Sequence, residues 1–304
     1  MNLLIFRHKF TLFMATSKLY QERIKALKKE YERLRKGKES LLKLLDEAEL
    51  SESVYNSNAI ENSTLTLPET EKILLEMEVT RKVSLREVFE AKNLARVMEY
   101  LTSKDTQNLD NEFILLLHKM LLGNINDEFA GRFRKAGEYV RVGTYIAPPP
   151  EFIEQYMKDL LIHFQTDSDA YFLDKIVDFH LQFEHIHPFC DGNGRIGRVL
   201  MNFQLRQIGF PPLIIRNKEK QAYYKALRAY DGRKNEKPMG KILALALLES
   251  LHKRVAYLKG TKIISLSEFA KKKREKLPTL NNAAKRQTIP AFREKGVWKT
   301  GSGF

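Results

Sequence analysis

The chain has 304 residues and a formal net charge of +14, with 43% hydrophobic and 30% charged residues. This length can bury a sizeable core, and the balanced composition excludes a disordered or fibrous chain. The excess of positive charge favours anionic partners such as nucleotides, nucleic acid or acidic membrane surfaces, but it does not specify a fold.

The N-terminal segment is apolar but short. Its longest uncharged run, residues 10–17, cannot span a membrane, and no small-residue cleavage site follows it. Because Met14 is followed at once by a helix-like basic segment, we interpret residues 1–18 as an extension ahead of the first helix. No other stretch approaches 18 uncharged apolar residues, so we expect a cytoplasmic protein without membrane contact.

Helical periodicity dominates the rest of the chain. Apolar residues recur at spacings of three and four over residues 20–50, which predicts one or two amphipathic helices. Similar patterns predict helices at 85–101, 110–122, 151–164, 170–184, 197–207, 220–230 and 238–259. The fold class is therefore mainly α. We divide the chain into a helical region at 19–110, a core at 111–258 and a small basic unit at 260–304.

Strand signal is scarce. The best candidate is "GEYVRVGTYIAPPP", in which residues of the segment 139–145 alternate in character before a proline run ends pairing. This pattern predicts a short hairpin.

The stretch "HPFCDGNGRIGR", His187–Arg198, follows one predicted helix and leads into another. Glycines at positions 192, 194 and 197 allow turn conformations and close approach of a ligand. A glycine-rich loop that enters a helix presents unpaired N–H groups and a partial positive charge. These features predict an anion site.

Charged side chains in the same stretch suit a polyphosphate. Arg195 and Arg198 lie three positions apart, on one face of the helix, where their guanidinium groups can grip phosphate oxygens. Asp191 would be repelled by that anion unless Mg²⁺ bridged the two. His187 suits the role of a base that accepts a proton from a hydroxyl, because the ordinary pKa of histidine lies near neutral pH.

Two other chemistries remain open at this point. Cys190, the single cysteine, would be a nucleophile if His187 lowered its pKa. His185 and His187 with Asp191 would suggest zinc, although the histidines lack helical ligand spacing. The P-loop pattern is not met, because no Lys-Ser/Thr pair follows the last glycine, and no strand precedes the loop as in a dinucleotide fold.

The stretch closely resembles the signature of Fic-domain proteins, His-x-Phe-x-Asp/Glu-Gly-Asn-Gly-Arg-x-x-Arg, at every fixed position. The resemblance implies a helical bundle with a hairpin flap, and transfer of AMP from ATP to a Ser, Thr or Tyr hydroxyl of a target protein. It implies His187 as the general base and Asp191 as the Mg²⁺ ligand. The residues that it assigns to ATP are Asp191, Gly192, Asn193, Gly194, Arg195, Gly197 and Arg198.

Further segments extend the resemblance to roughly residues 20–258. "AGRFRKAGEYVRVGTYIAPPP" is similar to the stretch that precedes and forms the flap, which pairs with a target segment by main-chain hydrogen bonds. The flap residues expected to bind the target are Val140, Arg141, Val142, Gly143 and Thr144.

"QAYYKALRAYDG" looks like the family's tyrosine pair near the adenine, which assigns Tyr223 and Tyr224 to ATP binding. Packing of this helix face on the core is the alternative. Relatives often carry Asn after that helix, whereas this chain has Asp231, so a base or ribose contact at this position is left open.

"SNAIENSTLTL" resembles the family's inhibitory helix, with Ser57, Glu61 and Asn62 at the matching positions. The resemblance implies that Glu61 pairs with Arg198 in place of the γ-phosphate and restrains the enzyme. Some such enzymes also use this glutamate to remove AMP. Without the resemblance, Glu61 would be assigned to solvent at a helix end.

The C-terminal unit reads as helix, turn, second helix and hairpin, which resembles a winged helix-turn-helix. Its basic residues suit DNA phosphates, while a solvated helix end or protein contacts are the alternatives. These residues are Lys271, Lys272, Lys273, Arg274, Lys285, Arg286, Arg293 and Lys295.

The competing functions are a DNA-binding regulator with a nucleotide-sensing Fic core, or a Fic enzyme that transfers UMP, phosphate or phosphocholine. Gly194 argues against the kinase variant, which carries lysine there. The target protein and a homo-oligomeric state are left open.

Overall fold

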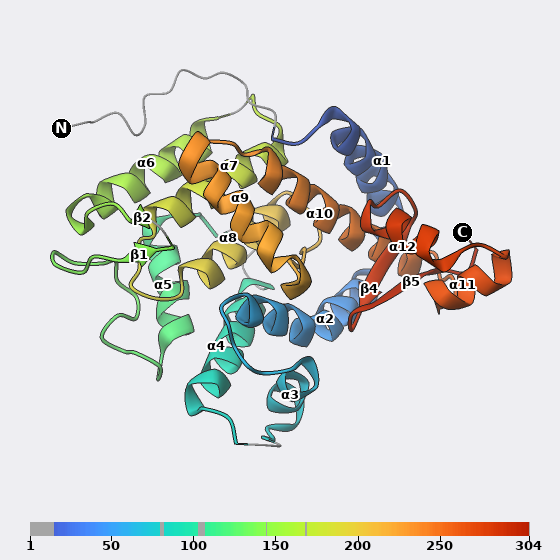
Figure 1. Cartoon of the computed structure of the whole chain (residues 1–304), viewed down its shortest axis with the longest axis horizontal. Coiled ribbons are helices and arrows are strands. Elements are labelled where there is room, and N and C mark those ends of the chain that lie inside the picture. The colour runs from blue at the N-terminus through green and yellow to red at the C-terminus, as the bar shows by residue number, and fades with distance from the viewer. Residues whose placement is uncertain (1–14, 80–81, 103–106, 144, 168, 304) are drawn as a thin grey trace.

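The computed structural model describes residues 15–79, 82–102, 107–143, 145–167 and 169–303. Most of this part of the chain is helical, so the mainly α fold class is confirmed (Figure 1). Residues 1–14, in which most of the predicted extension falls, lie outside the described residues.

The helices lie close to the predicted segments, and their bounds are as follows. The α-helices are α1 (Lys18–Arg35), α2 (Glu39–Ile60), α3 (Leu67–Glu71), α4 (Leu85–Thr102), α5 (Asn111–Leu122), α6 (Ile153–Thr166), α7 (Phe172–Ile186), α8 (Asn193–Gln207), α9 (Lys220–Arg233), α10 (Lys237–Leu258), α11 (Leu266–Lys273) and α12 (Leu277–Lys285). Short helical turns are η1 (Lys72–Glu76), η2 (Pro150–Phe152) and η3 (Asn217–Glu219). The strands are β1 (Arg141–Val142), β2 (Tyr145–Ile146), β3 (Ile263–Ser265), β4 (Ala291–Glu294) and β5 (Val297–Gly301).

Helix α7 lies between two buried clusters. Phe179 and Phe183 belong to the cluster formed with α4, α5 and α6, whereas Leu173 and Val177 belong to the cluster formed with α1, α9 and α10. A helix that is apolar on opposite sides has to be covered on both. Helix α8 contributes to the same two clusters, so both helices that flank the glycine-rich turn are fixed in the core.

The turn between α7 and α8 is tighter than predicted. Helix α7 ends at His187, and α8 begins at Asn193 after Gly192, whose φ of +84° suits glycine. The predicted start at residue 197 is therefore wrong. Gly194 and Gly197 lie inside α8 and form no turn. Their missing side chains make room for neighbouring residues that pack against the helix.

Helix α3 was not predicted, although the sequence carries a start signal for it. The Thr66 side chain accepts a hydrogen bond from the Glu69 amide, and the Glu69 side chain accepts one from the Thr66 amide. This reciprocal pair is a capping box, and Pro68 suits the first turn. The helix is short, so its apolar periodicity is weak.

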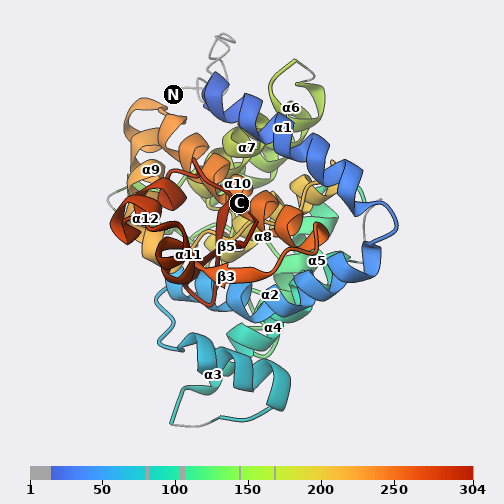
Figure 2. The ribbon, with the colours of Figure 1, turned by 90° about the vertical axis from the view of Figure 1, so that its right-hand side faces the viewer.

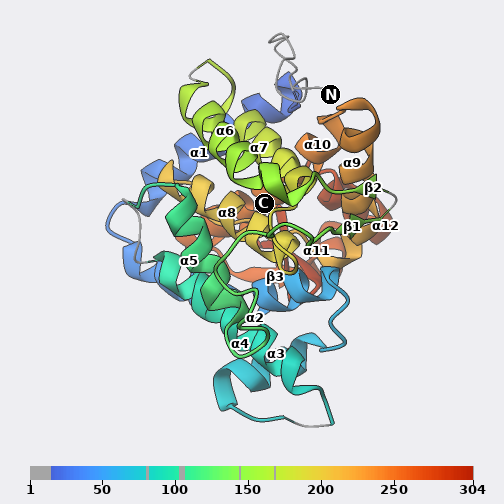
Figure 3. The same cartoon turned by 90° about the vertical axis from the view of Figure 1, so that its left-hand side faces the viewer.

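The hairpin β1–β2 is antiparallel, with Val142 opposite Tyr145. It lies on the side of the molecule away from the C-terminal unit and faces the viewer in Figure 3. The prediction of a short hairpin over residues 139–145 is confirmed, with pairing shifted to end at Ile146. Thr144 lies outside the described residues.

The C-terminal unit contains the predicted succession of helix, turn, helix and hairpin, and also an unpredicted strand, β3. Its antiparallel sheet has the order β3-β5-β4, and α11 and α12 cover a small core with Phe269, Leu280 and Ala291. Figure 2 shows this unit packed against α10 with α2 passing beside the sheet.

Two residues expected to contact DNA phosphates are paired with carboxylates of the protein: Arg293, which is part-buried, and Lys295, whose side chain is 69% exposed. Arg293 is bound to Glu249 and Glu219, so that expectation is wrong for Arg293, whose guanidinium is neutralised within the molecule. Lys295 is paired with Glu71 across 2.9 Å. The other basic residues of the prediction, on α11, α12 and the turn between them, are exposed.

Within the described ranges, none of the helices combines the length and the apolar character that crossing a bilayer requires.

Candidate functional site

Arg198 holds a carboxylate at the start of α8. Its Nη2 donates to Glu61 Oε1 across 2.8 Å, while Nε donates to the Ser57 hydroxyl at 3.0 Å and Nη2 also to the Ser57 carbonyl at 2.9 Å. The Arg198 side chain is 6% exposed and that of Glu61 34%. Burial would lower the pKa of Arg198, but Glu61 beside it raises that pKa, so the guanidinium stays charged.

Gly194 makes room for that carboxylate. A Cβ at position 194 would lie 2.2 Å from Glu61 Oε1, which no side chain tolerates. The Glu61 carboxylate therefore stands against the first turn of α8, where the helix carries a partial positive charge. The anion site expected from the glycine-rich turn exists, and a side chain of the same protein fills it.

The segment after Glu61 is held in place as well. Asn62 adopts a left-handed conformation with a φ of +70°, which suits Asn just after a helix end, and its Oδ1 accepts a 2.7 Å hydrogen bond from Lys220 Nζ. Ser63 and Thr64 donate to the Glu87 carboxylate of α4. The structure thus brings Ser57 and Glu61 to Arg198, as the resemblance implied for Glu61, while Asn62 is held by α9.

Asp191 belongs to a closed ring of alternating charges. Its carboxylate is bonded to Arg86 of α4 and, across 3.0 Å, to Arg195. Glu90 closes the ring through Arg86 at 3.1 Å and Arg195 at 3.2 Å. Burial would raise the pKa of Asp191, but Arg195 and Arg86 hold it below its ordinary value. Asp191 is therefore ionised, as a cation ligand must be.

Arg86 and Glu90 were not found from the sequence. The helix that carries them was predicted, but nothing in its polar pattern indicates which of its charges meets the glycine-rich turn. Arg195 is buried within this ring, so phosphate binding through Arg195 stays a prediction that requires it to rearrange.

His187 is fixed by its backbone and neutral in charge. It ends α7 with a φ of +51°, and its carbonyl accepts a 2.8 Å hydrogen bond from Arg134 Nε. Arg134 also donates to the carbonyls of Glu138 and Pro148, which ties the flap to the His187 turn. Burial lowers the pKa of His187 to about 4. At neutral pH the imidazole is thus free to accept a proton.

The tautomer of His187 follows from its neighbour. Nδ1 lies 3.3 Å from the Glu184 carbonyl, which can only accept a hydrogen bond. The proton therefore belongs on Nδ1, and the lone pair is on Nε2.

Asn193 and Phe189 hold the turn together. The Asn193 side chain accepts from the Phe189 amide at 2.9 Å and donates to the Phe189 carbonyl at 2.8 Å. The Phe189 ring is fully buried and stacks on His118. This packing anchors the turn on the core.

A buried polar cluster lies beneath Gly197. Tyr223 hydroxyl is 2.8 Å from His180 Nε2 and 3.5 Å from Glu184 Oε1. Burial raises the pKa of Glu184 to about 8 and lowers that of His180 to about 3, so both are neutral. Tyr223 is 1% exposed. The helix face that carries Tyr223 packs on the core here, so the predicted contact with adenine has no open surface.

Tyr224 and Asp231 take part in other contacts. The Tyr224 hydroxyl donates to the carbonyl of Ile60, the residue before Glu61, at 2.8 Å. Asp231 Oδ1 lies 2.8 Å from His185 Nδ1, and the His185 ring stacks on Tyr145 of the flap. Asp231 thus supports the histidine that lies beneath the hairpin.

The flap residues differ in exposure. Arg141 and Gly143 are exposed, Val140 and Val142 are half-buried, and Gly143 has a φ of +58° that forms the turn. Tyr145 anchors β2 by donating to the His185 carbonyl at 3.0 Å. The hairpin is therefore fixed beside the residues that precede His187.

The alternative chemistries lose support. Burial raises the pKa of the Cys190 thiol to about 11, and the thiol is directed at Glu138 rather than at His187. A thiol in this state is a poor nucleophile. Across the described ranges, no cluster of three or more His, Cys, Asp or Glu side chains could hold a metal ion, and His185 is bonded to Asp231.

A single carboxylate beside an anion site is the donor set that Mg²⁺ uses together with phosphates. The residues present therefore fit Mg²⁺ bound jointly by Asp191 and a polyphosphate.

The arrangement is a helical bundle in which a glycine-containing turn, preceded by a histidine, joins two buried helices. Residues 108–205 match the model of the Fic/DOC family. The protein adenylyltransferase Fic of Nematostella vectensis is 34% identical over 181 residues, which cover 57% of this chain and 42% of the relative. The protein adenylyltransferase fic-1 of Caenorhabditis elegans is 33% identical, with 57% and 35% covered. The chain spans less than half the length of these curated relatives.

Solved structures share the fold over a longer range. A Fic domain containing signaling protein from Bacteroides thetaiotaomicron aligns with a TM-score of 0.71 at 26% identity, covering 78% of this chain and 97% of that one. A Fic family protein from Desulfovibrio desulfuricans aligns with a TM-score of 0.61 at 22% identity, covering 93% and 96%. The second similarity concerns the fold alone and extends it to nearly the whole chain.

Proposed function

We propose that this protein transfers AMP from ATP to a hydroxyl side chain of a target protein, and that Glu61 restrains it. The observation that carries the proposal is the placement of a neutral His187 and an ionised Asp191 in the turn that leads into α8, where Arg198 and Gly194 accommodate a carboxylate. The adenylyltransferase names of the relatives support the same reaction class.

In the proposed reaction, the target hydroxyl oxygen forms a bond to the α-phosphorus of ATP. The bond from that phosphorus to the oxygen bridging to the β-phosphate breaks, and pyrophosphate leaves. The hydroxyl proton passes to His187 Nε2, whose lone pair is free because Nδ1 faces the Glu184 carbonyl.

The charged groups act on the phosphates. Arg198 would hold the terminal phosphates once Glu61 has left it, and the start of α8 would stabilise their charge. Mg²⁺, held by Asp191, would neutralise charge on the polyphosphate. For that purpose Asp191 has to exchange Arg86 for the metal, which is feasible because the Arg86 side chain is 55% exposed.

Restraint follows from competition for Arg198. The guanidinium cannot donate the same N–H to Glu61 and to a phosphate, so nucleotide binds productively only after the carboxylate is displaced. Removal of AMP by the same site, with Glu61 positioning a water molecule, is an alternative reaction. An assay with labelled nucleotides and a premodified protein distinguishes the two reactions.

A panel of labelled nucleotides with Mg²⁺ tests the proposal. We expect label from ATP on the protein itself and on lysate proteins, with a mass increase of one AMP, in Glu61→Gly and none in Glu61→Gly with His187→Ala. Transfer from UTP instead of ATP would identify a different donor. Loss of AMP from a premodified protein would identify the reverse reaction.

DNA binding by the C-terminal unit is a second proposal, supported by exposed Lys271, Lys273, Arg274, Lys285 and Arg286 on and between two short helices. Duplex binding measured across a salt series should show a steep salt dependence. Replacing Lys285 and Arg286 with Gln should reduce that slope, whereas salt-independent binding would contradict phosphate contacts. A cytoplasmic location is also proposed, because a single cysteine suits a reducing compartment.

A further inference from the structure

Helix α2 joins the C-terminal unit to the catalytic site. Glu49 and Glu52, in the middle of the helix, form ion pairs close to β4. Ser57, in its last turn, and Glu61, its C-cap residue, both bind Arg198. Figure 1 shows the helix running from beside β4 to the start of α8, and Figure 2 shows it passing next to the C-terminal sheet. One continuous helix therefore touches both places.

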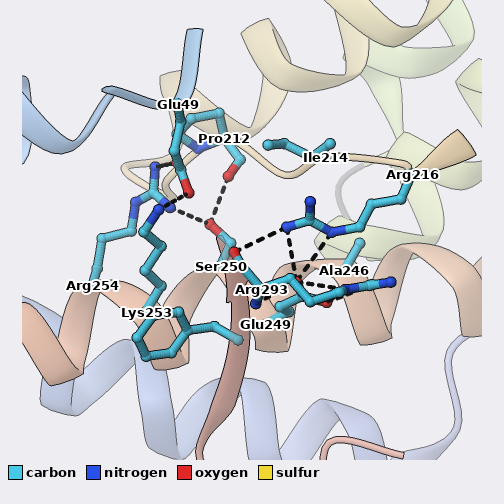
Figure 4. A pocket seen from close by; sticks show the side chains of 11 residues that line it. Glu49, Pro212, Ile214, Arg216, Ala246, Glu249, Ser250, Lys253, Arg254 and Arg293 are labelled. Atoms are coloured by element: carbon cyan, nitrogen blue, oxygen red, sulfur yellow. Dashed lines mark hydrogen bonds and ion pairs between the residues drawn. The ribbon is translucent and has the colours of Figure 1, made fainter. Parts of the chain in front are cut away.

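The contact with the C-terminal unit is a buried ion network, and Figure 4 shows the part of it around Glu249, Arg216 and Arg293. Glu249 of α10 bonds Arg216 at 2.9 Å and Arg293 of β4 at 2.7 Å. Arg216 in turn binds Glu52 of α2. The amide of Lys295, between β4 and β5, donates to Glu52 Oε2 at 3.2 Å. A chain of charges thus runs from β4 through Arg216 to α2.

A second branch lies one turn earlier on α2. Glu49 pairs with Lys253 of α10 at 2.9 Å, and Lys253 pairs with Glu294 of β4 at 3.2 Å. Arg254 binds Glu49 and Asp46 from the same side. Both branches end on β4, so this strand is fixed to α2 at two points.

Burial makes these contacts stiff. Glu49, Glu52, Arg216 and Glu249 are each 6% or 7% exposed. A buried charge that loses its partner is strongly destabilised, so the network opens only as a unit. The rise per residue of an α-helix places Glu61 about 13 Å along the axis from Glu52. A shift of α2 at Glu52 is therefore passed to Glu61.

A further connection reaches the last turn of α2 through η3, the segment that follows Arg216. Arg293 bonds Glu219 of η3 at 2.7 Å. In the same segment the Asn217 amide donates to Asn56 Oδ1 at 2.9 Å, and Lys220 donates to Asn62. Arg293 thus contacts α2 through both Arg216 and η3.

We infer that the C-terminal unit controls how firmly Glu61 holds Arg198, with α2 as the connecting element and Arg293 as its main contact. The inference rests on the proposed restraint by Glu61. A ligand of the C-terminal unit that favours a displaced β4 would weaken the inhibitory contact, since it shifts the population toward the released state.

Arg293→Gln tests the coupling through activity. We expect its AMP transfer to rise severalfold over the unmodified chain, and to rise no further when Glu61→Gly is already present, because both changes act on one contact. Full activity of the double variant also shows that it folds. Glu268→Gln removes an exposed ion pair of α11 with Lys272 that is not part of the network, and it should leave activity unchanged.

An equal rise in both backgrounds, or no rise in Arg293→Gln while Glu61→Gly is activated, would overturn the inference. Failure of Glu61→Gly itself would instead refute the proposed restraint.

Hydrogen exchange measures the coupling without catalysis. Amides of residues 57–63 should exchange at least threefold faster in Arg293→Gln than in Glu268→Gln, while amides of α7 stay equally protected. Unchanged exchange at 57–63 would show that the C-terminal unit does not act on the inhibitory segment, whatever the enzyme's activity.

Discussion

Arg198 and Glu61 are 137 positions apart in the chain and share a hydrogen bond of 2.8 Å between Nη2 and Oε1. The contact stands at the start of α8, over a glycine whose missing side chain makes room for it. Ser57 accepts from Nε and Nη2 of the same guanidinium, so two of its three nitrogens are bonded to the segment that carries Glu61. The state described here is thus one in which the anion site is occupied from within.

Glu61→Gly should raise AMP transfer strongly, with self-modification as the readout. The change frees the guanidinium for phosphate, and a charge-assisted hydrogen bond of about 1.5–3 kcal/mol corresponds to roughly ten- to a hundredfold in productive binding. The double variant with Arg198→Ala should lose that gain, because both residues act on one interaction. Wild-type activity of Glu61→Gly at saturating Mg²⁺-ATP would mean that the pair is only structural.

His187→Ala should abolish transfer in the Glu61→Gly background and leave ATP affinity within a few-fold. The imidazole acts on the hydroxyl proton, whereas the phosphates are held by other residues. Single-turnover transfer and calorimetric ATP binding separate the two effects. A variant that kept most of its turnover would exclude His187 as the base.

The pH dependence of kcat/KM should lack a histidine step near neutrality. Burial lowers the pKa of His187 from its ordinary 6.5 to about 4, so the basic form is kept until the pH falls toward 4. Rates for Glu61→Gly at saturating Mg²⁺ should therefore stay level between pH 7 and about pH 5 and decline below. Circular dichroism at each pH checks folding. An apparent pKa of about 6.5 would contradict the buried, neutral imidazole.

Asp191→Ala should weaken nucleotide binding in Mg²⁺ and leave binding without the metal nearly unchanged. The carboxylate is the group that a cation shares with the phosphates, and its loss removes that bridge. Titrations of ATP with Mg²⁺ and with EDTA give the comparison. Equal dependence on Mg²⁺ in the variant and the parent would show that the metal binds elsewhere.

Gly197→Ala should destabilise the fold by about 1–3 kcal/mol, because its Cβ would come 2.8 Å from Glu184 and 3.1 Å from His180, both buried. Gly232→Ala is the matched control, since nothing lies within 4 Å of the added carbon in α9. It should be neutral or stabilise by up to about 1 kcal/mol. Thermal unfolding measures both, and equal Tm values would show that Gly197 is not needed for packing.

The sequence predicted those features that depend on short-range patterns. Apolar spacing located most helices, and the twelve residues from His187 to Arg198 indicated an anion site, a base and a cation ligand. Resemblance of "SNAIEN" to an inhibitory helix then placed Glu61 against Arg198, which the geometry bears out. Periodicity alone would have left Glu61 in solvent.

The rest depended on contacts between distant segments. Arg86 and Glu90 complete the ring around Asp191 from a helix about a hundred positions away. In the sequence, nothing distinguishes these two charged residues from the others on the polar face of that helix. Arg293 was read as a phosphate contact because a sequence shows its charge but not the buried Glu249 that neutralises it. Tyr223 was assigned to a pocket for the same reason, since its partner His180 is 43 positions away.

The ring of Asp191, Arg86, Glu90 and Arg195 constrains which changes of sequence this protein can accept in evolution. Two of its members, like Ser57 and Glu61, lie outside the segment 108–205 that matches the family. That segment is therefore not a portable module: grafted onto another scaffold, it would keep the sequence signature but leave Asp191 and Arg195 without half of their counter-ions. A relative that acquired this signature would also need compensating changes in its first ninety residues.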